Sequence, residues 1–151
     1  MKHLFIVNNT AGGGKKTMPL IPKIEAYFAS KRLDYKVVST TKRGEATEIA
    51  RNAADCGEPI RIYACGGDGT FNETVSGVLQ SGVDLPIGYI PAGSTNDFAN
   101  SLQLPLDIPQ AAHVSAGGTP FRVDMGSFGG RFFSYVSSFG AFTRASYATP
   151  Q

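Results

Sequence analysis

Residues 59–82 read PIRIYACGGDGTFNETVSGVLQSG, the most informative stretch of the sequence. Its first part, Pro59–Cys65, is a short apolar run of the kind that forms a buried strand. A helix is predicted after the glycines, because apolar side chains recur at the i, i+4, i+7 and i+8 positions: Phe71, Val75, Val78 and Leu79. Gly82 is placed to end that helix. A strand that runs through a glycine-rich loop into a helix is the repeating unit of an α/β protein.

The same alternation of strand and helix continues on both sides of this stretch. Further strands are predicted at Lys2–Val7, Tyr35–Ser39 and Pro86–Ile90. Further helices are predicted from Pro19 onward, over Gly44–Ala54, around Phe98 and Leu102, and over Ile108–Ser115. Repeated strand–helix units favour an α/β fold in which a parallel sheet carries helices on both faces.

The pattern changes after residue 119. Residues 121–128 and 131–139 lie on either side of Gly129-Gly130, which predicts an antiparallel hairpin with a two-residue turn. We therefore expect an α/β domain over residues 1–120. Residues 121–151 are expected to form the first hairpin of a second, β-rich domain that is cut short.

Composition excludes several classes of protein. The 151 residues suffice for about one domain, and a hydrophobic fraction of 42% excludes a disordered chain. No apolar run approaches the roughly 20 residues of a membrane span. Cys56 and Cys65 match no zinc or redox spacing, so we expect two small buried side chains in a reduced, cytoplasmic protein. His3 and His113 belong to no recognisable catalytic set, and His113 is expected at the surface.

Charge is distributed unevenly along the chain. Residues 1–43 hold nine Lys and Arg against two acidic residues, whereas residues 44–151 hold five against ten. Such a basic segment can face phosphates, nucleic acid or an anionic membrane, but it can equally be the solvated faces of helices. No interleaving of aromatic and basic residues indicates a nucleic-acid surface, so no nucleic-acid partner is expected.

Three loops are predicted to meet at one edge of the sheet, because each follows a parallel strand: Asn8–Gly14, Gly66–Thr70 and Gly93–Asp97. Ligands of open α/β sheets bind at the carboxyl ends of the strands. In the second loop, the glycines let backbone N–H groups approach an anion at a helix N-terminus. A carboxylate such as Asp68 fits a phosphate site only when a cation lies between them or when it acts on a proton. A simple glycine turn, in which Asp68 bonds its own backbone, is the alternative.

Helix capping is a further interpretation of the same loops. Thr70 with Glu73, and Ser94 with Asp97, have the spacing of a capping box, so both pairs are expected at helix starts. The first loop contains Gly12-Gly13-Gly14-Lys15-Lys16, but it lacks the spacing of a P-loop or of a dinucleotide-binding fingerprint. It is either a nucleotide-facing loop with Lys15 or Lys16 near phosphates, or a mobile loop.

Three segments resemble one known family. Residues 65–73 (CGGDGTFNE) are similar to the GGDGT-x-NE signature of the diacylglycerol kinase catalytic domain, a family that includes bacterial soluble lipid kinases and sphingosine kinases. Residues 90–99 (IPAGSTNDFA) are similar to the second motif of the bacterial lipid kinases, with Ser94 where Thr is common. Residues 123–126 followed by 131–133 resemble the family's passage into its second domain. NAD kinases share a similar GGDGT loop but lack the NDFA segment.

The resemblance implies Mg²⁺-dependent transfer of the γ-phosphoryl group of ATP to a lipid hydroxyl. It implies a set of residues that face ATP: Asn8, Thr10 and Gly12, then Thr40, then Gly66, Gly67, Asp68, Gly69, Thr70 and Asn72, and finally Ser94. Asp68, Asp97 and Asp124 would form the acidic catalytic network, with Asp68 at the metal, directly or through water.

The resemblance also implies that this chain is the ATP-binding N-terminal part of a lipid kinase. Bacterial members run to about twice this length, and their second, β-sandwich domain carries the general base and further metal ligands. We therefore expect the chain alone to be inactive, and the whole protein to contact a membrane peripherally. Aromatic residues of the hairpin would favour a homodimer. The alternatives are a small-molecule kinase related to NAD kinase and a stand-alone nucleotide-binding module.

Overall fold

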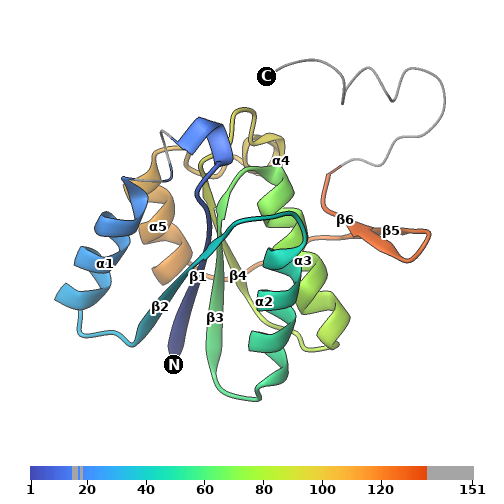
Figure 1. Ribbon diagram of the computed structural model, residues 1–151, viewed down its shortest axis with the longest axis horizontal. Coiled ribbons are helices and arrows are strands. Elements are labelled where there is room, and N and C mark those ends of the chain that lie inside the picture. The colour runs from blue at the N-terminus through green and yellow to red at the C-terminus, as the bar shows by residue number, and fades with distance from the viewer. Residues whose placement is uncertain (15–16, 18, 136–151) are drawn as a thin grey trace.

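The computed structural model describes residues 1–14, 17 and 19–135, and it shows a four-stranded parallel sheet between two layers of helices (Figure 1). The strands are β1 (Lys2–Asn8), β2 (Tyr35–Thr40), β3 (Ile60–Gly66) and β4 (Ile87–Pro91). Their order across the sheet is β2-β1-β3-β4. The α/β fold predicted from the sequence is confirmed.

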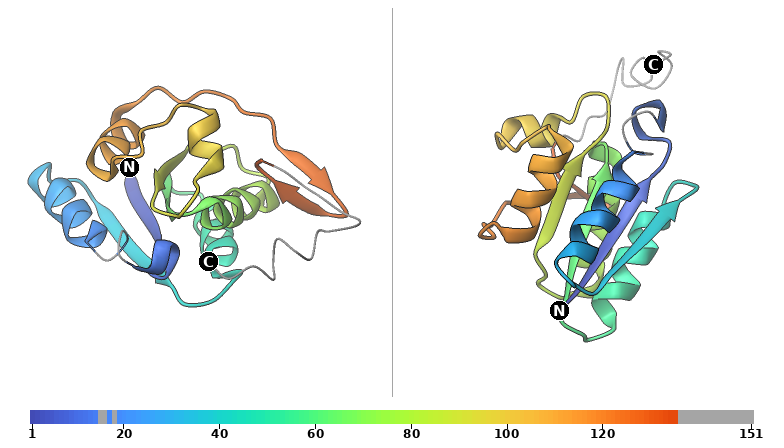
Figure 2. Two further views of the ribbon diagram at one scale, coloured as in Figure 1. Left: turned by 90° about the horizontal axis from the view of Figure 1, so that it is seen from above. Right: turned by 90° about the vertical axis from the view of Figure 1, so that its left-hand side faces the viewer.

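Helices cover both faces of the sheet. They are α1 (Leu20–Ser30), α2 (Glu45–Asp55), α3 (Asp68–Ser81), α4 (Asp97–Ser101) and α5 (Ile108–Gly117), and a 3-10 turn, η1 (Ala11–Gly14), follows β1. The helices α1 and α5 pack on one face, while α2 and α3 pack on the other (Figures 1 and 2). The helix α4 lies close to the carboxyl end of β4 (Figure 1).

β1 is a central strand, which explains its continuous apolar run. It pairs with β2 on one side and with β3 on the other. Phe5 and Val7 face the α1–α5 layer, and Leu4 and Ile6 face the α2–α3 layer. A strand buried on both faces has no polar alternation, as β1 shows. β2 is an edge strand, and only its last residue, Thr40, is buried.

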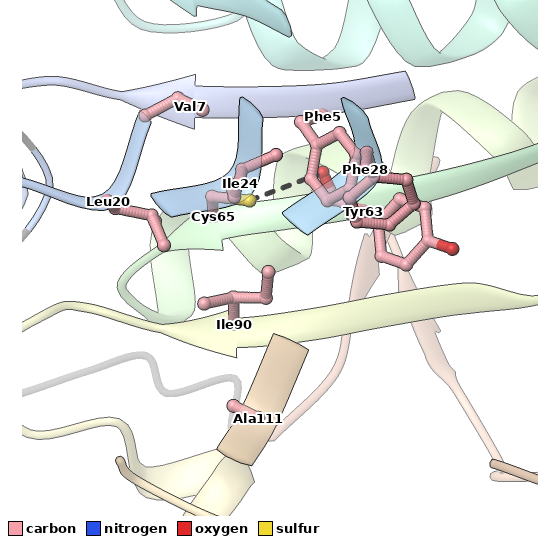
Figure 3. Packing of buried hydrophobic residues seen from close by; sticks show 9 residues of the cluster. All are labelled: Phe5, Val7, Leu20, Ile24, Phe28, Tyr63, Cys65, Ile90 and Ala111. Carbon is pink, nitrogen blue, oxygen red and sulfur yellow. Dashed lines mark hydrogen bonds between the residues drawn. The ribbon is translucent and has the colours of Figure 1, made fainter. Parts of the chain in front are cut away.

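The face under α1 and α5 has an aromatic core (Figure 3). Phe5 and Tyr63, on neighbouring strands, stack with their ring centroids 4.3 Å apart, and Phe28 of α1 meets Phe5 edge-on at 4.8 Å. Such pairs contribute about 0.5–1.5 kcal/mol each beyond the area that they bury. His3 extends this cluster, because it is buried and its Nδ1 lies 2.7 Å from the Tyr63 hydroxyl.

The predicted hairpin is present but shorter than expected. Its strands, β5 (Gly126–Phe128) and β6 (Arg131–Phe133), have three residues each. Gly129 and Gly130 have φ angles of 56° and 75°, as a two-residue turn between such strands requires. Residues 121–125 form no strand, so the expectation of a strand over 121–128 is wrong there. The rest of the predicted second strand, 136–139, lies outside the described residues.

The two cysteines differ in environment. Cys65 is buried in β3, as predicted, whereas Cys56 is exposed. The expectation of two buried cysteines is therefore wrong for Cys56, which lies just after α2 and donates its thiol hydrogen to Ala53 O at the solvent-facing helix end. His113 is exposed, as expected. Within the described residues, no helix has both the length and the apolarity to cross a bilayer.

Candidate functional site

The strand order places a topological switch point between β1 and β3 at the carboxyl edge of the sheet. The chain passes from β1 to β2 on one side and then returns to β3 on the other side of β1. Loops that leave β1 and β3 therefore diverge to opposite faces, and ligands of open α/β sheets bind at such a switch point. The loops after β1, β3 and β4 are the three that the sequence analysis identified, and hydrogen bonds join them.

Asn8 connects the first loop to the second. Its Nδ2 donates to Thr70 Oγ1 at 3.2 Å. Its Oδ1 accepts from both the N–H and the hydroxyl of Thr10, at 3.0 and 2.8 Å. Thr40 pairs with Asn8 in the sheet register and ends β2 beside them. Gly12, in η1, follows four residues after Asn8 along the same loop. The structure thus brings the predicted residues of the first loop and Thr40 to one edge.

Two glycines allow the second and third loops to cross closely. A Cβ atom on Gly67 would lie 3.2 Å from Gly93 Cα, which is tighter than most real Cβ contacts. The N–H of Ala92 donates to Gly66 O at 2.7 Å, which extends the β3–β4 pairing into the loops. The backbone at this crossing has no room for side chains, which holds the second loop against the third.

α3 begins with free backbone donors. Gly67, in an extended conformation, is its N-cap, and Phe71 N–H donates to Gly67 O at 3.1 Å. The structure gives no acceptor, within its described residues, for the N–H groups of Asp68, Gly69 and Thr70. A Cβ on Gly69 would meet nothing within 4 Å, so space is open at this helix start. Free N–H groups at the positive end of a 14-residue helix form a site for an anion.

The predicted Thr70–Glu73 capping box is not formed. Thr70 is the third residue of α3 rather than its cap, because the helix already starts at Asp68. Gly67 caps the helix without any side-chain bond, and the Thr70 hydroxyl instead accepts from Asn8. The spacing was compatible with a cap, but the glycines before it let the helix begin earlier.

Asp68 holds the start of α4. Its Oδ2 accepts from Asp97 N–H at 2.9 Å, and its Oδ1 accepts from Phe98 N–H at 3.0 Å. The Thr95 hydroxyl lies 3.5 Å from Oδ2. The alternative in which Asp68 bonds its own backbone is therefore wrong. Asp68 caps a helix that begins 29 residues later in the chain.

The predicted Ser94–Asp97 capping box is not formed either. Asn96 is the N-cap of α4, with a left-handed φ of 53°, and the first N–H groups of the helix bond to Asp68. The Asn96 side chain turns back to Gly93, accepting from its N–H at 2.9 Å and donating to its carbonyl at 3.1 Å. Ser94 stays exposed in this loop. Asn tolerates the left-handed region better than most residues, which was the signal available in the sequence.

Asp68 and Asp97 lie next to each other and have no basic partner within residues 1–14, 17 and 19–135. The ion pairs of the described residues are Lys2–Glu58, at the amino ends of β1 and β3, and Arg122–Asp84, which joins the segments before β4 and before β5. Two carboxylates without a counter-ion, beside a helix N-terminus, fit a hydrated divalent cation. Asp124 is exposed before β5, and no three His, Cys, Asp or Glu side chains gather within the described part of the chain. Asp124 therefore does not complete a three-carboxylate cluster in this arrangement. Lys15 and Lys16 lie outside the described residues.

Two further side chains depart from what the sequence indicated. Asn72, expected to face ATP, instead bonds the hairpin: its Nδ2 donates to Phe132 O and its Oδ1 accepts from Ser134 N–H. Tyr89, which no motif marked, is 4% exposed, and its hydroxyl has no hydrogen-bond partner among the described residues. Burial, and after it the Asp68 carboxylate, raises the pKa of Tyr89. A protonated phenol therefore lies close to the acidic pair.

Comparison with known proteins gives a consistent result. The family model of the diacylglycerol kinase catalytic domain matches residues 2–128. The chain is 32% identical over 149 residues to a diacylglycerol kinase of Staphylococcus saprophyticus and 33% identical over 151 residues to one of Bacillus subtilis. Each alignment covers 99% of this chain, and they cover 48% and 50% of those relatives. The chain thus spans about half the length of the curated relatives it matches.

A solved structure shares the fold. The crystal structure of a diacylglycerol kinase from Bacillus anthracis matches with a TM-score of 0.72 at 27% sequence identity. The match covers 87% of this chain and 47% of that chain. Sequence and fold therefore lead to the same group of proteins.

Proposed function

The chain belongs to the diacylglycerol kinase catalytic domain family, and on that premise we propose that it binds ATP with Mg²⁺ as part of a lipid kinase. The observation that carries the proposal is the start of α3. Three N–H groups there have no acceptor among the described residues, and space is open at Gly69. The carboxylates of Asp68 and Asp97 adjoin them and form no ion pair within that part of the chain. This combination suits a phosphate chain with a bound divalent cation.

The phosphates of ATP would bind the N–H groups of Asp68, Gly69 and Thr70. Gly69 has no side chain, and a Cβ there would enter open space, which lets a polyphosphate approach the backbone at the start of α3. Other proposed nucleotide contacts border the same edge and were derived from the family resemblance: Asn8, Thr10, Gly12, Thr40, Gly66 and Ser94.

Mg²⁺ would be held by the phosphates of the nucleotide and, through water, by Asp68 and Asp97. Contact through water is favoured for Asp68 because both of its carboxylate oxygens already accept backbone N–H bonds. When bound, the cation neutralises negative charge on the phosphates. The family motif alone supports Asp124 as a third acidic member of the network.

Catalysis of phosphoryl transfer depends mainly on positioning and on electrostatic stabilisation. The residues of this chain supply both on the nucleotide side. Asn8 and Asp68 tie the three loops together, so that the donors are held in place before the nucleotide binds. The N–H groups of α3 then orient the phosphates without side-chain rearrangement.

The acceptor is proposed to be a lipid hydroxyl, because the curated relatives matched by this chain are named diacylglycerol kinases. We also propose that residues 121–151 begin a second domain and that this chain alone binds ATP without phosphorylating lipid. Contact with a membrane surface would follow from such an acceptor. A homodimer through the hairpin is proposed because Phe128 and Tyr135 are 64% and 49% exposed. A small-molecule kinase related to NAD kinase is less favoured, since residues 90–99 match the lipid-kinase motif.

Isothermal calorimetry with ATP and Mg²⁺ tests the nucleotide site. Gly69→Ala is the decisive variant, because its Cβ enters open space at the helix start and leaves the fold intact. We expect at least a fivefold loss of ATP affinity with no loss of thermal stability. Gly117→Ala, at the end of α5 and also in open space, is the matched control and should bind ATP like the wild type. Equal affinity in both variants would show that the phosphates bind elsewhere.

A further inference from the structure

Asn72 joins α3 to the hairpin by two hydrogen bonds. Its Nδ2 donates to Phe132 O at 3.2 Å, and its Oδ1 accepts from Ser134 N–H at 2.9 Å. Both contacts are partly buried, and they connect segments about 60 residues apart in the chain. Figure 1 shows the hairpin beside α3, at the side of the sheet away from β2.

The register of the hairpin explains why the Phe132 carbonyl and the Ser134 N–H are not used within the hairpin and can bond Asn72. Arg131 pairs with Phe128 across the turn, and Phe133 pairs with Gly126. The backbone groups of successive strand residues point to opposite sides, so those of Phe132 and Ser134 point away from β5. They form the outer edge of β6, where a third strand would otherwise pair.

The Asn72 amide takes the place of that third strand. A primary amide offers a donor and an acceptor side by side, as a peptide group in a neighbouring strand would. An ionised carboxylate could accept from Ser134 but could not donate to Phe132 O. An amide at position 72 is needed to bond both backbone groups at once, which we call paired recognition. A position that only faced phosphate would not require Asn.

Asn72 also lies close to the phosphate-binding donors. It follows Thr70 by two residues on the same helix, and Thr70 N–H is one of the free donors at the start of α3. A second contact of this region comes from Met125, just before β5, which packs partly buried against the cluster that contains Phe71 and Phe98. The hairpin is thus attached to the turn of α3 that the nucleotide would approach.

We propose that Asn72 is a positioning residue: it clasps the β5–β6 hairpin to α3 and so sets where the hairpin lies relative to the phosphate-binding loop. The role in catalysis rests on the proposed function, whereas the clasp itself does not. Loss of the clasp would misplace the acceptor side of the site while the nucleotide side stays intact. A misplacement of about 1 Å can reduce a rate by about 100-fold.

Amide exchange measured by NMR tests the clasp in this chain. In Asn72→Ala, we expect the Ser134 amide to exchange at least tenfold faster than in the wild type, with the amides of β1 and β3 unchanged. Asn52→Ala, an exposed position on α2, is the control and should leave Ser134 exchange as it is. Ser134 exchange within twofold of the wild type in Asn72→Ala would overturn the clasp.

Asn72→Asp is a second test variant. Its side chain has the size of Asn, and its ability to donate to Phe132 O depends on pH, so the clasp can be switched on and off in one folded protein. The protonated carboxyl group can donate to Phe132 O, whereas the ionised group cannot. The hairpin chemical shifts of Asn72→Asp should therefore approach those of the wild type at low pH and move away from them as pH rises through the pKa of the new carboxyl. Shifts that do not change with pH beyond those of the wild type would contradict the paired recognition.

Calorimetry and turnover separate the clasp from a nucleotide contact. Asn72→Ala should bind ATP within twofold of the wild type, and in the protein at its native length it should lower kcat for diacylglycerol about 10–100-fold with KM for ATP unchanged. A large loss of ATP affinity with an intact hairpin, or an unchanged kcat, would overturn the positioning role. If the wild type does not bind ATP, the proposed function fails while the exchange result still decides the clasp.

Discussion

Replacing Asp68 by Ala should destabilise the fold, even without any ligand. The substitution removes both acceptors at the start of α4, namely those for Asp97 N–H and Phe98 N–H. A five-residue helix has no intrinsic stability, so α4 depends on such tertiary contacts. A carboxylate that only held a cation would leave folding unchanged.

The magnitude follows from the two bonds. A hydrogen bond to a charged acceptor contributes about 1.5–3 kcal/mol when it is buried, and less where water can replace it. The Asp97 N–H bond is exposed and the Phe98 N–H bond is partly buried, so the loss is estimated at about 2 kcal/mol in total. For a protein of this size, that lowers Tm by about 4–8 °C.

Thermal unfolding followed by circular dichroism measures this effect. Asp68→Asn, which keeps one acceptor oxygen, should lose about half as much as Asp68→Ala. Asp107→Ala, which removes the single side-chain cap of α5, serves as a reference and should cost about 1 kcal/mol. Glu25→Gln, exposed on α1, should not change Tm. An Asp68→Ala variant that melts within 1 °C of the wild type would refute the capping role.

Three further outcomes are expected. The pKa of His3 is lowered by burial and, after it, by Arg61 and the N-terminal charge. As pH falls below about 6.5, the unfolded chain therefore binds a proton at His3 before the folded protein does. The free energy of unfolding decreases from there down through the pKa of His3 in the folded state. Urea titrations at pH 7.5 and 5 should therefore differ less for His3→Gln than for the wild type. Gly93→Ala should lower Tm by several degrees, because its Cβ would lie 2.8 Å from Asn96 Oδ1 and meet Gly67 Cα. Gly69→Ala, whose Cβ enters open space, should instead raise the free energy of unfolding by about 0.5–1 kcal/mol, as measured by calorimetry. A thiol reagent should modify Cys56 rapidly in the native protein and Cys65 only on unfolding, since Cys65 is buried and burial raises its pKa; two equally fast thiols would contradict this assignment.

Secondary structure was predictable wherever burial imposes a period. The stripe on α3 predicted Phe71, Val75 and Val78 as buried, and they are. Leu79, at the margin of the same stripe, is 38% exposed, because its side of the helix is not covered. The strand order was not predictable in this way, since an apolar run such as that of β1 encodes burial on two faces but not the identity of the neighbours.

The site was predictable in position but not in its internal connections. The three loops meet because parallel strands end at one edge, which follows from strand–helix alternation. The bonds of Asp68 to α4 and of Asn72 to β6 span 29 residues or more, and no local pattern encodes them. The capping-box spacing was misleading for a physical reason: the glycines before Thr70 provide an earlier helix start than a hydroxyl cap would.

The central place of β1 also determines when this protein can fold during synthesis. β1 is made before both of its neighbours, and His3 and Tyr63 of β3 are 60 positions apart. At about 5–20 residues per second, the ribosome needs roughly 3–12 s between them. For that time the run Leu4-Phe5-Ile6-Val7 has no β3 to pair with and no complete layer to cover it. For seconds, the nascent chain therefore carries an apolar strand that can pair with β2 on one edge but has its β3 edge open, which exposes β1 to chaperone contact or aggregation.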